Sequence, residues 1–147
     1  MEIAVTKAIR EVLQKEDITN QELAKRIGIE PWRVTRFLGD DKDIRSLVWI
    51  EFLSAIGYEL RMVPKNAGGD TIVLDSGDNT PLKVLNRILV ISADKKAEVV
   101  QQLGISRQAM SQITKSNNDI RANRFVEIAG ILGYEVRMEK VALKVVE

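Results

Sequence analysis

The side chains that could carry out chemistry are limited, because the chain contains neither cysteine nor histidine. Disulfides, thiolate nucleophiles, zinc fingers, imidazole metal sites and Ser-His-Asp triads are therefore excluded. Carboxylate, lysine, tyrosine and hydroxyl chemistry remain, but no constellation of these groups in the sequence indicates a catalytic site. We therefore expect a protein that is not an enzyme and that uses no cofactor.

The densest group of potential metal ligands is Asp40, Asp41 and Asp43. Lys42 interrupts this group, and the spacing of a calcium-binding loop does not follow it. We therefore predict no metal site.

The composition is that of a folded protein with a core, since 45% of the 147 residues are hydrophobic and 29% are charged. The net charge of +1 produces no overall basic field that would indicate a nucleic-acid partner. No stretch approaches the ~18 uninterrupted apolar residues of a membrane span. The N-terminus carries Glu2 and alternates apolar with charged residues, unlike a signal peptide. We expect a cytoplasmic protein without membrane association.

The elements that must position any site repeat along the chain. A shift of 76 residues aligns matching pieces without a gap: Gly28-Ile29 with Gly104-Ile105, Asp43-Ile44-Arg45 with Asp119-Ile120-Arg121, and Gly57-Tyr58-Glu59 with Gly133-Tyr134-Glu135. The sequence therefore predicts two copies of one unit, at about residues 4–64 and 81–140.

Helical spacing is clear within each copy. The apolar residues of the last helix recur at i, i+3, i+4 and i+7, as Trp49, Phe52, Leu53 and Ile56 and again as Phe125, Ile128, Ala129 and Leu132. Earlier in each copy, two short apolar faces are separated by one glycine, Gly28 or Gly104. A glycine at such a turn accepts a positive φ, so each pair of faces predicts a helix-turn-helix.

Strand signals follow the last helix of each copy. Residues 58–63 and 71–74 predict a β-hairpin that closes at Gly68-Gly69. The polar residues 75–80 predict a flexible connector, which gives a first domain at 1–74 and a second at 81–147. The tail 141–146 is apolar enough for a strand. It is expected to pair with 134–139, to join the first hairpin, or to be covered by a second chain in a homodimer.

The helix-turn-helix segments resemble a known family. Residues 19–29 (TNQELAKRIGI) and 105–113 (ISRQAMSQI) resemble the Xre/Cro-like, phage-repressor type of helix-turn-helix. The resemblance implies a mainly α protein of two tandem five-helix domains, each with a small β-strand or hairpin that is similar to the C-terminal addition of antitoxin-type members. The sequence departs from the family pattern at Glu30, Asp94 and Val100.

The resemblance also implies a reading surface on double-stranded DNA, with the second helix of each motif in the major groove. The residues expected to read bases are Trp32, Arg33, Thr35 and Arg36 in the first copy, and Arg107, Gln108, Ser111 and Gln112 in the second. Those expected to contact phosphates are Asn20, Arg45, Lys96, Lys115, Asn117 and Arg121. A partly buried Trp32, and salt bridges from Arg45 and Arg121 to carboxylates such as Glu51 and Glu127, are the alternatives.

The expected function is that of a sequence-specific DNA-binding transcriptional regulator, a repressor of phage or mobile-element type. Because the two reading surfaces differ in sequence, one chain would act as a built-in dimer on two unlike half-sites. The alternative is a protein-binding helix-turn-helix module, either an antitoxin or a small phage-encoded inhibitor. The near-neutral charge favours this alternative, whereas the arginine and glutamine residues favour DNA.

Overall fold

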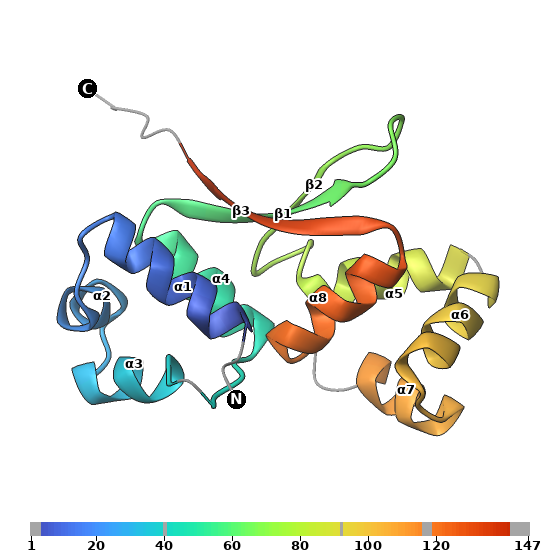
Figure 1. Cartoon of the computed structure of the whole chain (residues 1–147), viewed down its shortest axis with the longest axis horizontal. Coiled ribbons are helices and arrows are strands. Elements are labelled where there is room, and N and C mark those ends of the chain that lie inside the picture. The colour runs from blue at the N-terminus through green and yellow to red at the C-terminus, as the bar shows by residue number, and fades with distance from the viewer. Residues whose placement is uncertain (1–3, 40, 92, 116–118, 142–147) are drawn as a thin grey trace.

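The computed structural model of the chain describes residues 4–39, 41–91, 93–115 and 119–141, and these form a mainly helical fold with one small antiparallel sheet (Figure 1). The first half contains α1 (Ala4–Lys15), α2 (Asn20–Ile27), α3 (Pro31–Phe37) and α4 (Ser46–Ala55). The second half contains α5 (Pro81–Ile91), α6 (Ala93–Leu103), α7 (Arg107–Lys115) and α8 (Ala122–Ile131). The strands are β1 (Tyr58–Pro64), β2 (Ile72–Leu74) and β3 (Tyr134–Lys140).

Among the residues that the structure describes, each half has four helices rather than the five that the resemblance implies. The chain that follows Gly57 and Gly133 is extended instead of helical. Alternate residues of β1, namely Tyr58, Leu60 and Met62, are buried. A period of two is the period of a strand, so this segment covers the helices as part of a sheet.

The three strands form one sheet in the order β2-β1-β3. β2 folds back on β1 as the predicted hairpin, with Leu60 opposite Leu74. β3 pairs with the other edge of β1 along its full length. The two halves therefore share one sheet and one continuous apolar core. The greater part of the predicted tail strand, residues 142–146, lies outside the described residues.

The sequence repeat becomes a two-fold relationship in space. Arg61 lies opposite Arg137 in the sheet, and Arg45 forms an isolated antiparallel bridge with Arg121. In both pairs the partners are the equivalent residues of the two copies, 76 positions apart. A pseudo-two-fold axis therefore passes through both arginine pairs.

The bridge at this axis exchanges helix caps between the halves. The Ser46 amide donates to the Ile120 carbonyl, and the Ala122 amide donates to the Ile44 carbonyl, each at 2.7 Å. At the start of α4, Asp119 Oδ1 accepts from Ser46 Oγ at 2.6 Å and from the Leu47 amide at 3.3 Å. At the start of α8, Asp43 Oδ1 accepts from the Asn123 amide at 3.3 Å. Each aspartate thus satisfies the N-terminus of a helix in the other half.

Segment 75–80, predicted as a flexible connector, is a hydrogen-bonded turn. Asp75 Oδ1 accepts from the amides of Gly77 and Asn79, at 2.8 and 2.9 Å. Lys83 Nζ donates to the Gly77 carbonyl at 2.9 Å. These bonds connect the hairpin closely to α5.

The predicted glycine turns are present in both halves. Gly28 and Gly104 have φ values of +86° and +66°, in the left-handed region. The next helix of the second motif is capped by Ser106 Oγ, which accepts from the Ala109 amide at 3.0 Å. Glu30 makes no such cap bond at the start of α3. The two glycine turns are equivalent, whereas the helices that follow them differ in the capping of their N-termini.

We expect Gly28→Ala to lower the free energy of unfolding by about 1–2 kcal/mol, because an L side chain is strained at this φ although it would meet no neighbouring atom. Gly104→Ala should have a similar effect, measured by urea denaturation. Gly77→Ala is the matched control, since Gly77 has no positive φ and an added Cβ would make only an ordinary contact. Equal stabilities for the Gly28 and Gly77 variants would contradict the requirement for a glycine with positive φ at this turn.

A polar contact joins α1 to the end of the sheet. Glu16 accepts from Lys140 Nζ at 2.9 Å and from the Tyr58 hydroxyl at 2.9 Å. The hydrogen bond from Lys140, which has the larger effect, and the hydrogen bond from Tyr58 lower the pKa of Glu16 below its ordinary value. A carboxylate with a lowered pKa stabilises the fold above its ordinary titration range, and this contribution disappears as the pH falls through the folded-state pKa.

We therefore expect Glu16→Gln to be less stable than the unmodified chain at neutral pH, with the difference vanishing on acidification. Thermal unfolding at a series of pH values measures this difference. Lys140→Gln should lose stability over the same pH range. A Glu16→Gln deficit that persists at a pH where carboxylates are protonated would contradict the ionic origin of the contact.

Candidate nucleic-acid interface

The second helices of both predicted motifs lie on one side of the molecule. Figure 1 shows α3 and α7 at opposite ends of the side that faces away from the sheet. α3 is held there by buried Val34, and its Phe37 ring meets Phe52 of α4 edge-on, with ring centroids 5.8 Å apart. α7 is held by buried Met110. The inward faces of both helices are thus anchored in the core, and their polar faces point outward.

The four residues predicted to read bases from α3 are all exposed. Trp32 is 57% exposed, so it is not the packing residue of the alternative interpretation, and its Nε1 donates to the Glu30 carboxylate. Thr35 Oγ1 donates to the Pro31 carbonyl at 3.2 Å. The guanidinium groups of Arg33 and Arg36 make no hydrogen bond or ion pair with other described residues. They are therefore the polar groups of α3 that are available to a ligand.

The corresponding face of α7 has a different chemistry. Arg107, Gln108 and Gln112 are exposed and Ser111 is half-buried. The first three make no side-chain hydrogen bond with the part of the chain that the structure describes. At the positions equivalent to Arg36 and Trp32, this helix has Gln112 and Gln108. α7 therefore presents amide groups where α3 presents a guanidinium and an indole.

The predicted phosphate-contacting residues occupy different environments. Lys96 and Lys115 are exposed on α6 and at the end of α7. Asn20 is half-buried, and its Nδ2 donates to Thr35 Oγ1 at 3.3 Å. Asn117 lies outside the described residues. Lys96 and Lys115 are thus open to an anion, whereas Asn20 helps to fix α3.

Arg45 and Arg121 are exposed next to each other on the pseudo-two-fold axis. Arg121 Nη1 donates to the Asp43 carbonyl at 3.2 Å. Within the described ranges, neither arginine forms an ion pair, and Glu127 instead pairs with Arg124 at 3.3 Å. The predicted alternative of a structural salt bridge to Glu51 or Glu127 is therefore wrong, and both guanidinium groups face outward between the two halves.

A hollow of about 590 Å³ beside α3 gathers cations from both halves. Its lining includes Arg33 and Arg36 of α3, Lys42 of the following loop, and Arg121 from the second half. Two acids, Asp41 and Asp43, lie in the same lining. Lys42 was not predicted as a site residue, because its proximity to Arg121 depends on the bridge between the halves and has no local sequence signal.

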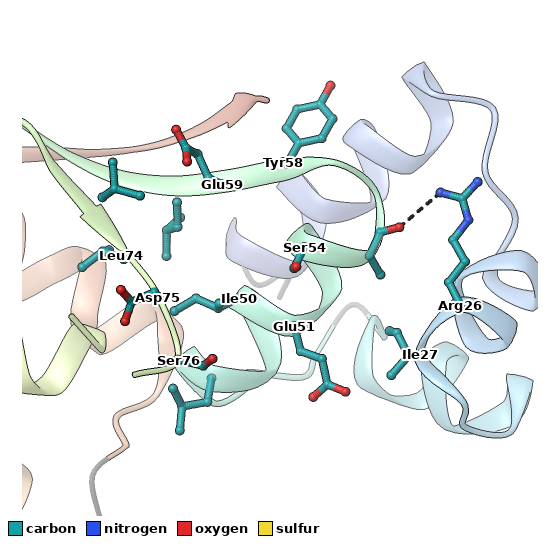
Figure 2. A pocket seen from close by; sticks show the side chains of 14 residues that line it. Arg26, Ile27, Ile50, Glu51, Ser54, Tyr58, Glu59, Leu74, Asp75 and Ser76 are labelled. Atoms are coloured by element: carbon teal, nitrogen blue, oxygen red, sulfur yellow. Dashed lines mark hydrogen bonds between the residues drawn. The ribbon is translucent and has the colours of Figure 1, made fainter. Parts of the chain in front are cut away.

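A second hollow, of about 670 Å³, lies away from α3 and α7, between α4, the end of α2 and β2 (Figure 2). Arg26 closes one end, where it donates to the Ala55 carbonyl at 3.2 Å and pairs with Glu22 at 3.2 Å. Leu74 and Ile50 lie along the opposite end. This hollow separates the hairpin from α4 and shares no residue with the surface of α3 or α7.

The described residues contain no group of three or more acidic side chains arranged to hold a metal ion. No helix among them is long and apolar enough to cross a membrane. Comparison of the chain with protein-family models, with curated proteins and with solved structures found no match.

Proposed function

We propose that the chain is a sequence-specific, double-stranded-DNA-binding transcriptional regulator with two tandem helix-turn-helix domains, and that it acts as a dimer within one chain. The observation that supports this most is the position of the outward helices α3 and α7. They lie on one side of the molecule, on either side of a pseudo-two-fold axis that is marked there by Arg45 and Arg121. B-form DNA has the same local two-fold symmetry, so a protein with this symmetry can present equivalent helices to both halves of a site.

In the proposed complex, α3 and α7 enter successive major grooves, about 34–36 Å apart along one side of the duplex. Arginine bridges O6 and N7 of guanine, and glutamine bridges N6 and N7 of adenine. Arg33 and Arg36 therefore favour guanine under the first half. Under the second half, Arg107 favours guanine, and Gln108 and Gln112 favour adenine. The operator is an asymmetric site that consists of two unlike half-sites in inverted orientation. Regulation follows from occupancy of that site.

Cations on the axis and at the helix ends supply the part of the affinity that does not depend on sequence. Four predicted phosphate-contacting residues, Arg45, Lys96, Lys115 and Arg121, are exposed. Each phosphate neutralised releases counterions, so the logarithm of the binding constant falls with the logarithm of salt concentration by about 0.9 per contact.

We expect binding to random duplex DNA to show a slope of about −4 in such a plot, from four contacts. Arg45→Ala with Arg121→Ala should make the slope shallower by about 2. Fluorescence anisotropy of labelled duplex DNA measures both. Arg61→Ala with Arg137→Ala is the matched control, because that pair lies on the same axis in the sheet, away from α3 and α7. A flat salt response, or binding weaker than micromolar, would contradict the proposal.

The net charge of +1 supports one other candidate function, a protein-binding module. A surface that binds a protein has no need of the strong positive field that draws DNA to its binding proteins. The same salt series separates the two functions. A chain that binds only protein gives the flat response.

A further inference from the structure

The edge of β3 that faces away from β1 carries no strand among residues 4–39, 41–91, 93–115 and 119–141. β1 pairs on both edges, with β2 and with β3. Among the residues that the structure describes, no strand pairs with the outer edge of β3. β3 is seven residues long, whereas the strand that fills the equivalent edge of β1 has three. The pseudo-two-fold axis relates these two edges, so β2 indicates what the empty position can hold.

The residues of β3 that face the core are less buried than the equivalent residues of β1. Tyr58, Leu60 and Met62 of β1 are 7%, 1% and 0% exposed. Their counterparts Tyr134, Val136 and Met138 face the same side of the sheet but are only half-buried. The difference follows from β2, whose Leu74 is buried opposite Leu60.

The helix behind each edge shows the same contrast. In the first half, Ile50 points from α4 toward the segment that contains Leu74 and Asp75 (Figure 2), and it is half-buried. Its counterpart on α8, Val126, is 37% exposed. Within the described part of the chain, the outer edge of β3 and the side of α8 next to it thus form an open apolar surface. We call this surface the β3 edge and define it as Val126, Tyr134, Val136 and Met138.

The backbone of β3 presents hydrogen-bonding groups to this edge. The Val141 amide donates to the Gly57 carbonyl, and the Lys65 amide donates to the Gly133 carbonyl, so odd-numbered residues of β3 bond toward β1. Successive residues of an antiparallel strand alternate between its two neighbours. The N–H and C=O groups of Val136 and Met138 therefore point away from β1, as those of Leu60 and Met62 point toward β2.

We infer that the β3 edge binds one extended segment of a partner protein, which adds to the sheet as an antiparallel strand. By analogy with Ile72 and Leu74, the residues of that segment opposite Met138 and Val136 are apolar. Glu135 and Glu139 lie on the outer side of β3, on either side of Arg137. Glu135 pairs with Arg137 at 3.0 Å, whereas Glu139 forms no ion pair with the described residues, so the residue opposite Glu139 is basic. A single strand fits because β2, the occupant of the equivalent position, is a single strand with open edge beyond it.

This site goes beyond the proposed DNA-binding function and does not depend on it. The sheet and the reading helices lie on opposite sides of the molecule (Figure 1), so a strand at the β3 edge leaves α3 and α7 uncovered. One chain can then hold DNA and a protein segment together.

The first test is amide hydrogen exchange of the full chain without any partner. We expect the amides of Val136 and Met138 to exchange at least tenfold faster than those of Leu60 and Met62, which bond toward β2. Equal protection of all four amides would overturn the proposal, because the edge would then already be filled by the chain itself or by a second copy.

The second test uses a synthetic peptide, Lys-Ile-Val-Leu-Lys with blocked ends, which copies the centre of β2 and places lysines opposite Glu135 and Glu139. It should bind saturably and slow the exchange of the Val136 and Met138 amides. N-methylation of its leucine amide, which faces β3, should abolish binding, whereas N-methylation of its valine amide, which faces away, should not. Failure of the peptide to protect these amides, or equal binding of the two N-methyl peptides, would overturn the proposal.

A pair of chain variants completes the test. Glu135→Lys with Glu139→Lys should weaken binding of the peptide at least tenfold. Glu51→Lys with Glu98→Lys makes the same change of net charge at exposed positions away from the β3 edge, and it should leave the affinity unchanged. Equal losses in both variants would reduce the effect to net charge and would overturn the assignment of this edge.

Discussion

Phe52→Ala should lower the free energy of unfolding by about 3–5 kcal/mol, the largest stability effect that we expect from a single substitution in this chain. Phe52 is 1% exposed at the centre of α4, so truncation leaves a cavity that the surrounding core fills only in part. The substitution also removes the edge-on contact with Phe37, which holds α3 against the core. Urea denaturation followed by circular dichroism measures the change.

The contact between the rings can be separated from the burial of Phe52. Phe52→Leu keeps most of the buried volume and should cost less than Phe52→Ala, and a double-mutant cycle with Phe37→Leu should give a coupling of about 0.5–1.5 kcal/mol. Phe125 stands at the position equivalent to Trp49 and is a fully buried ring of the second half, so Phe125→Ala is the comparison variant there. A Phe52→Ala cost below about 2 kcal/mol would show that this core collapses around the cavity or is less tightly packed than the structure indicates.

The features that sequence reasoning predicted well are those with local causes. A glycine that must adopt a positive φ, such as Gly28 or Gly104, acts within a few residues of chain. The alternation of Tyr58, Leu60 and Met62 likewise indicates a strand by itself. The mainly helical fold and the hairpin follow from such signals.

The features that could not be predicted depend on residues far apart in the chain. Asp43 and Asp119 stood out in the sequence only as part of the repeat, and Asp43 also as part of a group of acids, yet each caps a helix of the opposite half. Arg45 and Arg121 were expected to contact phosphates, with salt bridges to carboxylates such as Glu51 and Glu127 as the alternative, but their environment is set by the bridge across the axis. The pairing of β3 with β1 has the same origin, because two identical strand patterns contain no information on whether they pair with each other. The sequence repeat predicted two equivalent units, and only the structure shows the axis that relates them.

The exposure of the residues expected to read bases could be predicted from helical spacing, whereas their partners could not. Apart from half-buried Ser111, these residues of α3 and α7 are exposed, because Val34 and Met110, at helical spacing from them, are buried. The residues expected to read bases from α3 are not equally available to a ligand. Trp32 donates a hydrogen bond to the Glu30 carboxylate, and Thr35 donates one to the Pro31 carbonyl. Lys42 joins Arg33 and Arg36 only through the fold of the loop against the second half. The two hydrogen bonds are local to α3, whereas the position of Lys42 is decided by tertiary contacts.

Arg33→Ala with Arg36→Ala should weaken binding to the selected operator by about 30-fold to 10⁴-fold, since each arginine–guanine contact contributes about 1–3 kcal/mol. The loss should fall on one half-site. DNA mutated there should bind the variant and the unmodified chain equally, whereas mutation of the other half-site should still weaken both. Operators selected from a random duplex pool, followed by anisotropy titration, measure this.

Arg107→Ala with Gln108→Ala should give the complementary pattern, with the loss confined to the other half-site. Arg61→Ala with Arg137→Ala removes the same number of cations from the sheet and should leave operator affinity unchanged. Because both helices are anchored by buried residues and carry their polar groups outward, either pair of truncations leaves the fold intact. If one of the two double substitutions has no effect on binding to any selected sequence, the helix that carries it has a structural role. The site is then read by one half of the chain, and the other half supplies only phosphate contacts and part of the shared sheet.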